Sequence, residues 1–234
     1  MWSTRPGRQA TDSIQGTMTA RSSITPAAVR TVALQLFAEK GYHGTAMSEI
    51  ASRLEIRTPS LYNHIESKQA LLAEIVLDTS RAVLDDFESA VTNPELSGDI
   101  AAQLVAAVRA YAHRHATHRN EALVVNADVA ALDEPARSEV FELRRNHEQG
   151  IRQLIVAGNE AGVFDVEQPT LASFGILEMC VAIARWFRDD GLLSAETTAA
   201  SHADFALRLV GHSGPRVGDE PSIRRNRPGR HPTT

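Results

Sequence analysis

The sequence predicts an all-α fold, and three observations support that class. Apolar residues between Thr25 and Val210 recur every three or four positions, which is the period of an amphipathic helix. The alternation of apolar and polar residues that marks a strand is missing from the same stretch. This stretch also contains Thr-Pro pairs, which start helices, and Gly residues, which end them.

Three short helices are expected in the first part of the chain. The first begins at Thr25-Pro26, a hydroxyl cap followed by proline, and ends at Gly41. The second opens at Thr45, whose side chain can cap it, and the third opens at Thr58-Pro59. Each helix is expected to bury an apolar face, and the residues of these faces are Val29, Ala33, Leu36, Phe37, Met47, Ile50, Ala51, Leu54, Leu61 and Ile65.

Longer helices are expected in the rest of the chain. One runs from 68 to about 91 and is broken at Asn93-Pro94, because proline disfavours helix in the residue before it. Beyond that break, Pro and Gly residues separate further helical stretches near 97–117, 120–132, 135–161, 169–189 and 194–210. Residues 71–211 are therefore expected to form a helical bundle behind a three-helix domain at 24–70.

The two ends of the chain differ in composition from the middle. Residues 1–23 and 212–234 are rich in Arg, Pro, Gly and Ser, and we expect a basic arm and a basic tail without fixed structure. Met18 is an alternative start that would shorten the arm. The arginines there could strengthen binding to a polyanion or simply keep the ends soluble, and they are Arg5, Arg8, Arg21, Arg224, Arg225, Arg227 and Arg230.

Charge and composition exclude several classes of protein. The formal charge is +3 over residues 1–70, −12 over 71–220 and +4 over 221–234, so basic ends flank an acidic middle. The longest apolar stretch, 171–187, contains two charged side chains and is shorter than the ~18 uncharged residues of a membrane helix. The single cysteine, Cys180, cannot form an internal disulfide and is expected to be a buried thiol. We expect a cytoplasmic protein without a cofactor.

The second and third helices form a helix-turn-helix pattern, since only residues 55–57 separate them. In such a module the later helix lies in the DNA major groove. If Leu61 and Ile65 face inward, polar residues cover the opposite side and the leading end, namely Arg57, Thr58, Ser60, Tyr62, Asn63 and His64.

The polar residues of the third helix suit two kinds of DNA contact. Asn63 can pair bidentately with adenine and Arg57 can reach guanine or phosphate, while Thr58 and Ser60 can bond to either. The phosphate contacts, which fix register without reading sequence, are assigned to Tyr62, His64 and Lys68. Thr45 completes the set of residues expected to contact DNA.

Three consecutive motifs of the chain resemble the amino-terminal signature of TetR-type (TetR/AcrR) transcriptional regulators. They are FAEKGY at 37–42, TAMSEIASRL at 45–54 and LYNHIESKQAL at 61–71, and the resemblance covers about residues 25–75. The rest of the chain is similar only in architecture. One departure is Glu55, where the family usually has glycine, and a positive φ there would cost this side chain roughly 1 kcal/mol.

The resemblance implies a homodimeric repressor. Its last two helices, 169–189 and 194–210, would form a four-helix interface with the partner, and two-fold symmetry would require a palindromic operator. The sequence tolerates this interface, although an internal core helix is the alternative explanation of the same apolar stripe, which contains Leu171, Phe174, Leu177, Val181 and Ala184.

The resemblance also implies a small-molecule effector, bound within about residues 90–190, that changes the spacing of the two DNA-reading heads. The segment RWFRDDG at 185–191 is similar to one in a branch of the family that responds to acyl-coenzyme A thioesters. A plain helix end, with Trp186 in the core, is the alternative explanation and the one that the residues themselves favour. The candidate effector-binding residues are Arg109, His113, Arg185, Trp186 and Arg188.

Two further classes of function are weighed against this one. His113, His115 and His118 point in different directions around a helix, so we expect no metal site, although one of them could line the ligand cavity. The chain contains no nucleophile elbow, phosphate loop or metal-binding helix, so we do not expect an enzyme. An all-α enzyme, an effector-independent DNA-binding factor and activation instead of repression stay open as alternatives.

Overall fold

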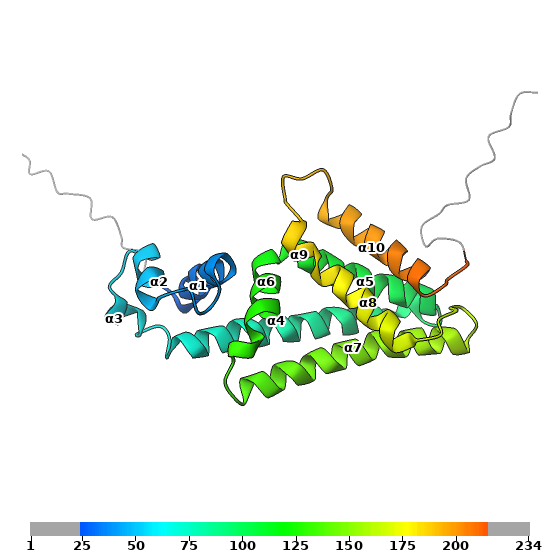
Figure 1. Cartoon of the computed structure of the whole chain (residues 1–234), viewed down its shortest axis with the longest axis horizontal. Helices are drawn as coiled ribbons and strands as arrows, with labels where there is room; N and C mark the ends of the chain where they lie inside the picture. The colour runs from blue at the N-terminus through cyan, green and yellow to red at the C-terminus, as the bar shows by residue number, and fades with distance from the viewer. Residues whose placement is uncertain (1–23, 215–234) are drawn as a thin grey trace, which may run out of the picture.

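The computed structural model describes residues 24–214, and this part of the chain contains helices and no strands, so the predicted all-α class is confirmed (Figure 1). The basic arm predicted at 1–23, and the tail from residue 215 on, lie outside the described residues. The α-helices are α1 (Pro26–Lys40), α2 (Met47–Arg53), α3 (Thr58–Leu61), α4 (Lys68–Val91), α5 (Ile100–Thr117), α6 (Arg119–Asp128), α7 (Ala136–Glu160), α8 (Pro169–Val181), α9 (Ile183–Trp186) and α10 (Ala195–Leu209), with 3-10 turns η1 (Pro94–Leu96) and η2 (Val129–Ala131).

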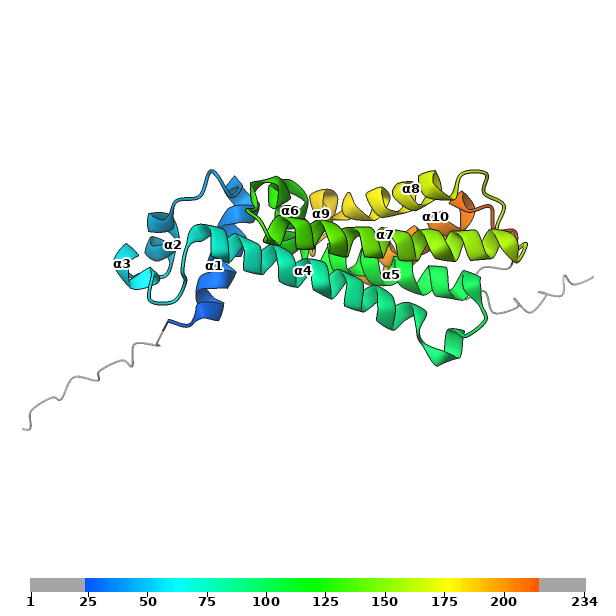
Figure 2. The same cartoon turned by 90° about the horizontal axis from the view of Figure 1, so that it is seen from below.

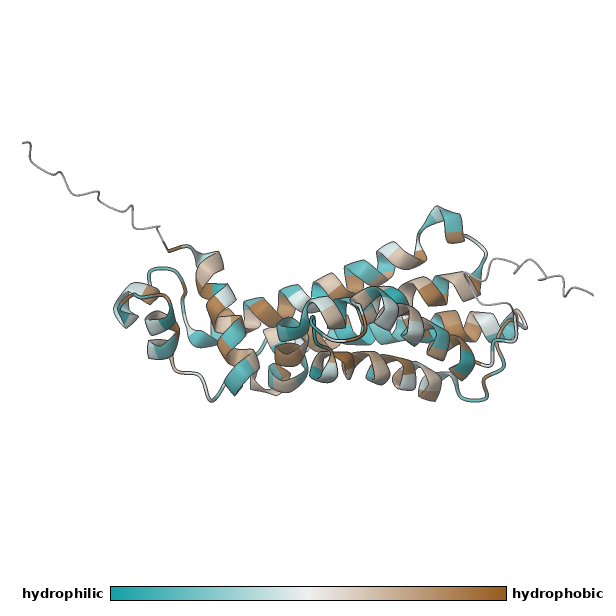
Figure 3. Ribbon diagram, turned by 90° about the horizontal axis from the view of Figure 1, so that it is seen from above, coloured by the Kyte–Doolittle hydropathy of each residue, from teal (hydrophilic) through white to brown (hydrophobic). Residues whose placement is uncertain are grey.

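The described chain has two hydrophobic cores, and α4 passes from one to the other (Figures 1 and 2). The first, here called the head core, joins α1, α2, α3 and the first half of α4 to α6 and the start of α7. The second, the body core, joins the end of α4 to α5, α7, α8, α9 and α10. Figure 3 shows that apolar residues dominate α8, whereas polar and apolar residues alternate along α4.

Short-range signals set the ends of α1. The Thr25 hydroxyl accepts a hydrogen bond from the Ala28 N–H at 3.1 Å, and Pro26 occupies the first helical position, as predicted. Gly41 ends the helix with φ +76°, and its N–H donates to the Phe37 carbonyl at 2.8 Å. The face that α1 buries includes Val29, Ala33, Leu36 and Phe37, which confirms the predicted stripe.

The predicted cap of α2 is wrong. The helix begins at Met47, and its N-cap is Ala46, which has no side-chain acceptor. Thr45 is instead 2% exposed, and its hydroxyl lies 3.2 Å from the Leu36 carbonyl and 3.0 Å from the Gly41 carbonyl, to which it can donate. Its role is to tie the end of α1 to the start of α2, because the hydroxyl needs a partner once it is buried.

The third helix is shorter than predicted. It begins at Thr58, with Arg57 as N-cap, and ends at Leu61, so Asn63 and His64 lie in the turn that follows. Successive i to i−3 hydrogen bonds, from Asn63 to Ser60 at 3.3 Å and from His64 to Leu61 at 3.0 Å, keep this turn helical in character. The buried Leu61 anchors the segment in the head core.

The predicted helix over 169–189 is divided. Helix α8 ends at Val181, and the chain tightens at Ala182, whose carbonyl accepts from the Arg185 N–H at 3.0 Å. Helix α9 then ends because Phe187 adopts an extended conformation and enters the body core at 4% exposure. Trp186 is 47% exposed, so the expectation of a core tryptophan is wrong and Phe187 takes that place. Cys180 is buried in the same core, as predicted.

The turn between α2 and α3 depends on a strained residue. Glu55, at the position where the family usually has glycine, adopts the left-handed conformation with φ +57°. Its N–H donates to the Ser52 carbonyl at 3.1 Å, and the next N–H, of Ile56, donates to the Ala51 carbonyl at 3.0 Å. Arg53, near the end of α2, pairs with Glu39 at 3.8 Å and not with Glu55.

Replacing this strained residue is expected to stabilise the protein. Glu55→Gly should raise the free energy of unfolding by about 1 kcal/mol, because glycine adopts a positive φ without a Cβ clash. Urea denaturation would measure the change. Glu55→Ala is the matched control, since it removes the same carboxylate but keeps the Cβ. Equal stabilisation in both variants would trace the effect to charge and contradict the conformational explanation.

Candidate DNA-binding surface and effector cavity

Six of the residues predicted to contact DNA lie on α3 or within a few residues of it, at the end of the head, and are exposed or partly exposed. Arg57, Ser60, Tyr62 and Asn63 are exposed, Tyr62 at 50%. Thr58 and His64 are partly exposed beside them. The surface is held by Leu61, which is 0% exposed, and it lies at the far end of the molecule from α10 (Figures 1 and 2).

Two of the residues assigned to DNA differ from the rest in their surroundings. Lys68, at the first turn of α4, places its Nζ 4.2 Å from the centre of the Tyr42 ring, a cation–π contact. Partial burial lowers the pKa of Lys68, and the Asp128 carboxylate opposes that shift. Thr45 is buried, so its hydroxyl is not available to DNA in this structure. The prediction that Thr45 contacts DNA is corrected accordingly.

A joint between head and body lies behind this surface. The Asp128 side chain, at the end of α6, accepts a hydrogen bond from the Tyr42 backbone N–H at 3.2 Å. The Tyr42 hydroxyl donates to Gln69 at 2.7 Å, and Gln69 donates to the Ala131 carbonyl at 3.0 Å. Burial raises the pKa of Asp128. The hydrogen bond from the Tyr42 N–H and the nearby positive charge of Lys68 act in the opposite direction and lower it. Sequence reasoning missed this joint because its partners are far apart in the chain.

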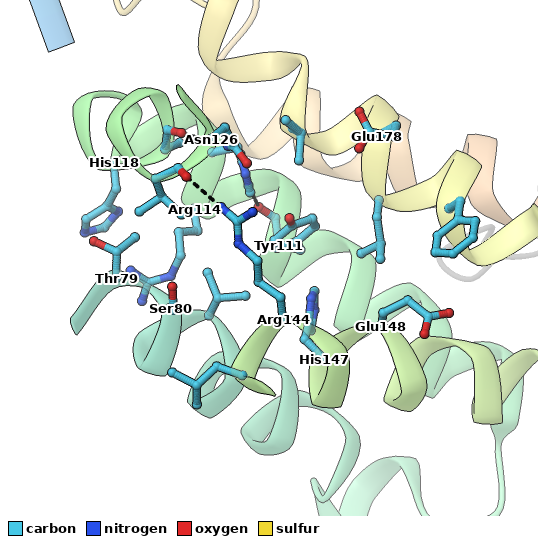
Figure 4. A pocket seen from close by; sticks show the side chains of 18 residues that line it. Thr79, Ser80, Tyr111, Arg114, His118, Asn126, Arg144, His147, Glu148 and Glu178 are labelled. Carbon is cyan, nitrogen blue, oxygen red and sulfur yellow. Dashed lines mark hydrogen bonds between the residues drawn. The ribbon is translucent and has the colours of Figure 1, made fainter. Parts of the chain in front are cut away.

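A cavity of about 230 Å³ lies in the body between α4, α5, α6, α7 and α8 (Figure 4). Its walls combine apolar side chains with polar groups that point inward. The lining residues are Thr79, Ser80, Val83, Tyr111, Arg114, His115, His118, Ala122, Val125, Asn126, Leu143, Arg144, His147, Glu148, Phe174, Leu177, Glu178 and Val181.

Three aromatic rings form the floor of the cavity. The ring of Tyr111 lies 4.3 Å from that of His115 and 4.7 Å from that of His147, measured between centroids. Burial raises the pKa of Tyr111, and it lowers the pKa of His147 to about 4, with a smaller contribution from His115. Burial also lowers the pKa of His115. Both imidazoles are therefore neutral at pH 7.

None of the five residues predicted to bind the effector lines this cavity. Arg109 is exposed, and His113 lies 3.6 Å from Glu196 of α10. The reason is the phase of α5, because residues two positions from Tyr111 project about 200° away from it. The Arg188 guanidinium donates to the Phe187 carbonyl at 2.9 Å, and Trp186 stacks 6.2 Å from His202.

Arg185 lines a smaller hollow of about 120 Å³ beside the cavity. The two hollows share Ala122, Asn126 and Val181 in their walls. Of the histidine cluster, His115 and His118 line the main cavity, whereas His113 does not. The sequence signal that could have located the cavity was the run of polar residues on the inner face of α7, which contains Arg144, His147 and Glu148.

The buried His147 is expected to make stability depend on pH. Its pKa is about 4 in the folded protein and about 6.5 in an unfolded chain. Between these values the unfolded chain binds more protons, so stability falls as the pH drops from 6.5 to 4, by on the order of 3 kcal/mol, and is level above that window. Thermal unfolding measured from pH 4 to 6.5 should show that the melting temperature of His147→Phe depends less steeply on pH than that of the native protein. An unchanged pH profile in the variant would refute this assignment.

No helix among residues 24–214 is long and apolar enough to cross a membrane.

Residues 30–75 match the family described as "Bacterial regulatory proteins, tetR family", and residues 97–210 match "Tetracyclin repressor-like, C-terminal domain". The transcriptional repressor KstR2 of Rhodococcus jostii is 27% identical over 179 residues, which cover 75% of this chain and 86% of KstR2.

Solved structures agree with these matches. A regulatory protein of the tetR family from Rhodococcus RHA1 superposes with a TM-score of 0.73 at 28% identity, covering 81% of this chain and 98% of that one. AibR, solved with isovaleryl coenzyme A and operator DNA, superposes with a TM-score of 0.64 at 25% identity, covering 80% and 98%. KstR2 is named as a transcriptional repressor and the Rhodococcus RHA1 protein as a regulatory protein, so the relatives are regulators and not enzymes. Together with the exposed helix-turn-helix surface, they show that this chain belongs to the TetR family of DNA-binding transcriptional regulators.

Proposed function

We propose that the protein is a homodimeric repressor that binds a palindromic operator through the α3 surface and is released by a small molecule bound in the cavity. The observation that carries this proposal is the row of exposed polar side chains on and after α3. Relatives named as repressors support the DNA-binding part. The 230 Å³ cavity supports an effector and disfavours a factor that works without one.

Within the surface, base reading and phosphate binding fall to different residues. Asn63 is exposed in the turn after α3 and has the amide that pairs bidentately with adenine, while Arg57 can reach guanine. Thr58 and Ser60 bond to either kind of group. Tyr62, His64 and Lys68 contact phosphates and fix the register of the head on the duplex.

The dimer is proposed to form through α8 and α10. Large apolar side chains are exposed on both helices, with Leu171 at 67%, Phe174 at 50%, Phe205 at 47% and Leu209 at 43%. The helices lie against each other, since a Cβ built at Gly175 would be 3.4 Å from Leu209. A face of this kind is costly in water and suits a second copy of the chain.

Helix α6 is proposed to couple the cavity to the DNA surface. Its residues Ala122, Val125 and Asn126 line the cavity, and Asp128 at its end binds the Tyr42 backbone beside Lys68. An effector that displaces α6 would move the joint and with it the head. The effector needs to favour the DNA-incompetent arrangement by roughly 1–3 kcal/mol for a typical response.

Acyl-coenzyme A thioesters are the first effector class to test. AibR was solved with isovaleryl coenzyme A. In this chain an acyl group would lie in the main cavity, and Arg185 in the adjoining hollow would meet the anionic end of the coenzyme.

Two substitutions test the DNA assignments. Asn63→Ala is expected to weaken binding to the preferred duplex about 10-fold or more and to relax base preference. Lys68→Ala is expected to weaken all sequences about equally and to reduce the slope of log affinity against log salt by about 1. Selection from random duplexes followed by fluorescence anisotropy across a salt series measures both. Equal loss of base preference in the two variants would contradict this division of roles, and thermal melting controls for folding.

A charge on the exposed apolar face tests the dimer. Phe205→Glu is expected to weaken self-association by about 2 kcal/mol or more, roughly 30-fold in Kd, because the carboxylate would be buried against the partner. Analytical ultracentrifugation would measure the change. Phe141→Glu, on α7, is the matched control, since both side chains are 47% exposed. If Phe205→Glu stays as dimeric as the control, this interface is wrong.

A further inference from the structure

We infer that the cavity recognises its ligand through a carboxylate, held between Arg144 and His147, while the apolar part of the ligand lies against the opposite wall. The inference deepens the proposed function and rests on it only in taking this cavity as the effector site. It differs from a plain acyl thioester, whose carbonyl is uncharged. A thioester whose acyl chain ends in a free carboxylate would be consistent with this inference and with the thioester proposal.

Arg144 is a cation without a counter-ion in the described structure. Its side chain extends from α7 into the centre of the cavity (Figure 4). One Nη donates to the Val125 backbone carbonyl at 2.6 Å, and no carboxylate oxygen among residues 24–214 lies within 4 Å of the guanidinium. A guanidinium has five N–H donors, so most of the donors of Arg144 are available to a ligand. A partly buried charge of this kind is stabilised by an anion.

The other charged groups of the cavity are already engaged or lie near its edge. Arg114 binds Asp86 at 2.5 Å. Glu148 accepts from the Ser173 hydroxyl at 2.8 Å and lies 3.3 Å from the Arg152 guanidinium. Glu178 is exposed and lies on α8, across the cavity from Arg144 (Figure 4). Of the two arginines that line the cavity, Arg114 is neutralised by Asp86 and Arg144 is not paired with a carboxylate, so a negative group of a ligand is expected beside Arg144.

His147 supplies a second donor on the same face. It follows Arg144 by three positions on α7, a spacing that places two side chains side by side. The residue is 4% exposed, and its Nε2 is buried with no hydrogen-bond partner. The ring is held by Tyr111 and by Phe87, whose ring centre is 5.4 Å away. A neutral imidazole with its proton on Nε2 can donate to one carboxylate oxygen while Arg144 binds the other.

The size of the cavity limits the ligand. A cavity of ~150 Å³ holds one benzene ring, so by the same ratio about 230 Å³ holds roughly nine non-hydrogen atoms. Hexanoate and benzoate are of this size. The hydrocarbon part would contact the apolar side chains of the remaining walls, which are Val83, Leu143, Phe174, Leu177 and Val181.

The same contact offers a route to regulation. Arg144 holds the Val125 carbonyl, three residues before Asp128 on α6. A carboxylate that draws the guanidinium toward itself would compete with that bond and loosen α6, the helix that binds the head through Tyr42.

Calorimetric titration of the full-length dimer tests the inference. The probes are hexanoate and benzoate at pH 7, each with its primary amide, which has the same shape and no charge. We expect the acids to bind at least 10-fold more tightly than the amides. Arg144→Met should remove this preference, and Arg144→Lys should restore part of it. Arg145→Met is the matched control, because Arg145 is the next residue on α7, is exposed and does not line the cavity. It should bind as the native protein does.

Thermal melting establishes that each variant is folded. The inference is overturned if the amides bind as tightly as the acids, if Arg144→Met keeps its preference for acids, or if no acid binds at millimolar concentration. A parallel operator-binding assay, which includes isovaleryl coenzyme A, separates the two proposals. Acids that bind through Arg144 without releasing DNA support the inference and contradict the proposed release. A thioester that releases DNA while the acids fail to bind contradicts the inference and supports the proposed release.

Discussion

The burial of α4 in two cores is the constraint on which the arrangement of this protein depends. Its first half packs Leu71, Leu72, Ile75 and Val76 into the head core, and its end packs Phe87 into the body core. Gly150 of α7 lies directly on that ring, since a Cβ there would be 2.4 Å from it. A continuous 24-residue helix spans about 36 Å, so movement at one end reaches the other as a change of angle and not as local disorder.

A single rigid helix could swing freely, and α6 is the second connection that prevents it. Helix α6 contributes Val124 and Val125 to the head core and also lines the cavity. Its end is fixed to the head by the Asp128 to Tyr42 hydrogen bond. Because a buried carboxylate that loses its partner is costly, this joint has a preferred geometry, and a ligand can shift it only by contacting α6 or its neighbours more favourably in another arrangement.

Much of the fold was predictable because its signals are local. The Thr25 cap and the Gly41 turn each depend on residues within one turn of the chain. The errors came from tertiary packing. The burial of Thr45 requires the end of α1, and the cavity-facing side of α5 depends on where α4 and α7 lie. Periodicity gives the faces of a helix but not the direction in which each face points.

Arg144 illustrates the same limit at the candidate site. In the sequence it stands beside Arg145, and nothing local distinguishes two adjacent arginines on an amphipathic helix. In the folded chain, Arg144 reaches the Val125 carbonyl of α6, whereas Arg145 is exposed to water. The guanidinium that is desolvated interacts far more strongly with an anion than its exposed neighbour, because the surrounding dielectric is lower. Placement of this one charge, next to a neutral buried histidine, is the basis of the carboxylate preference that we propose for the cavity.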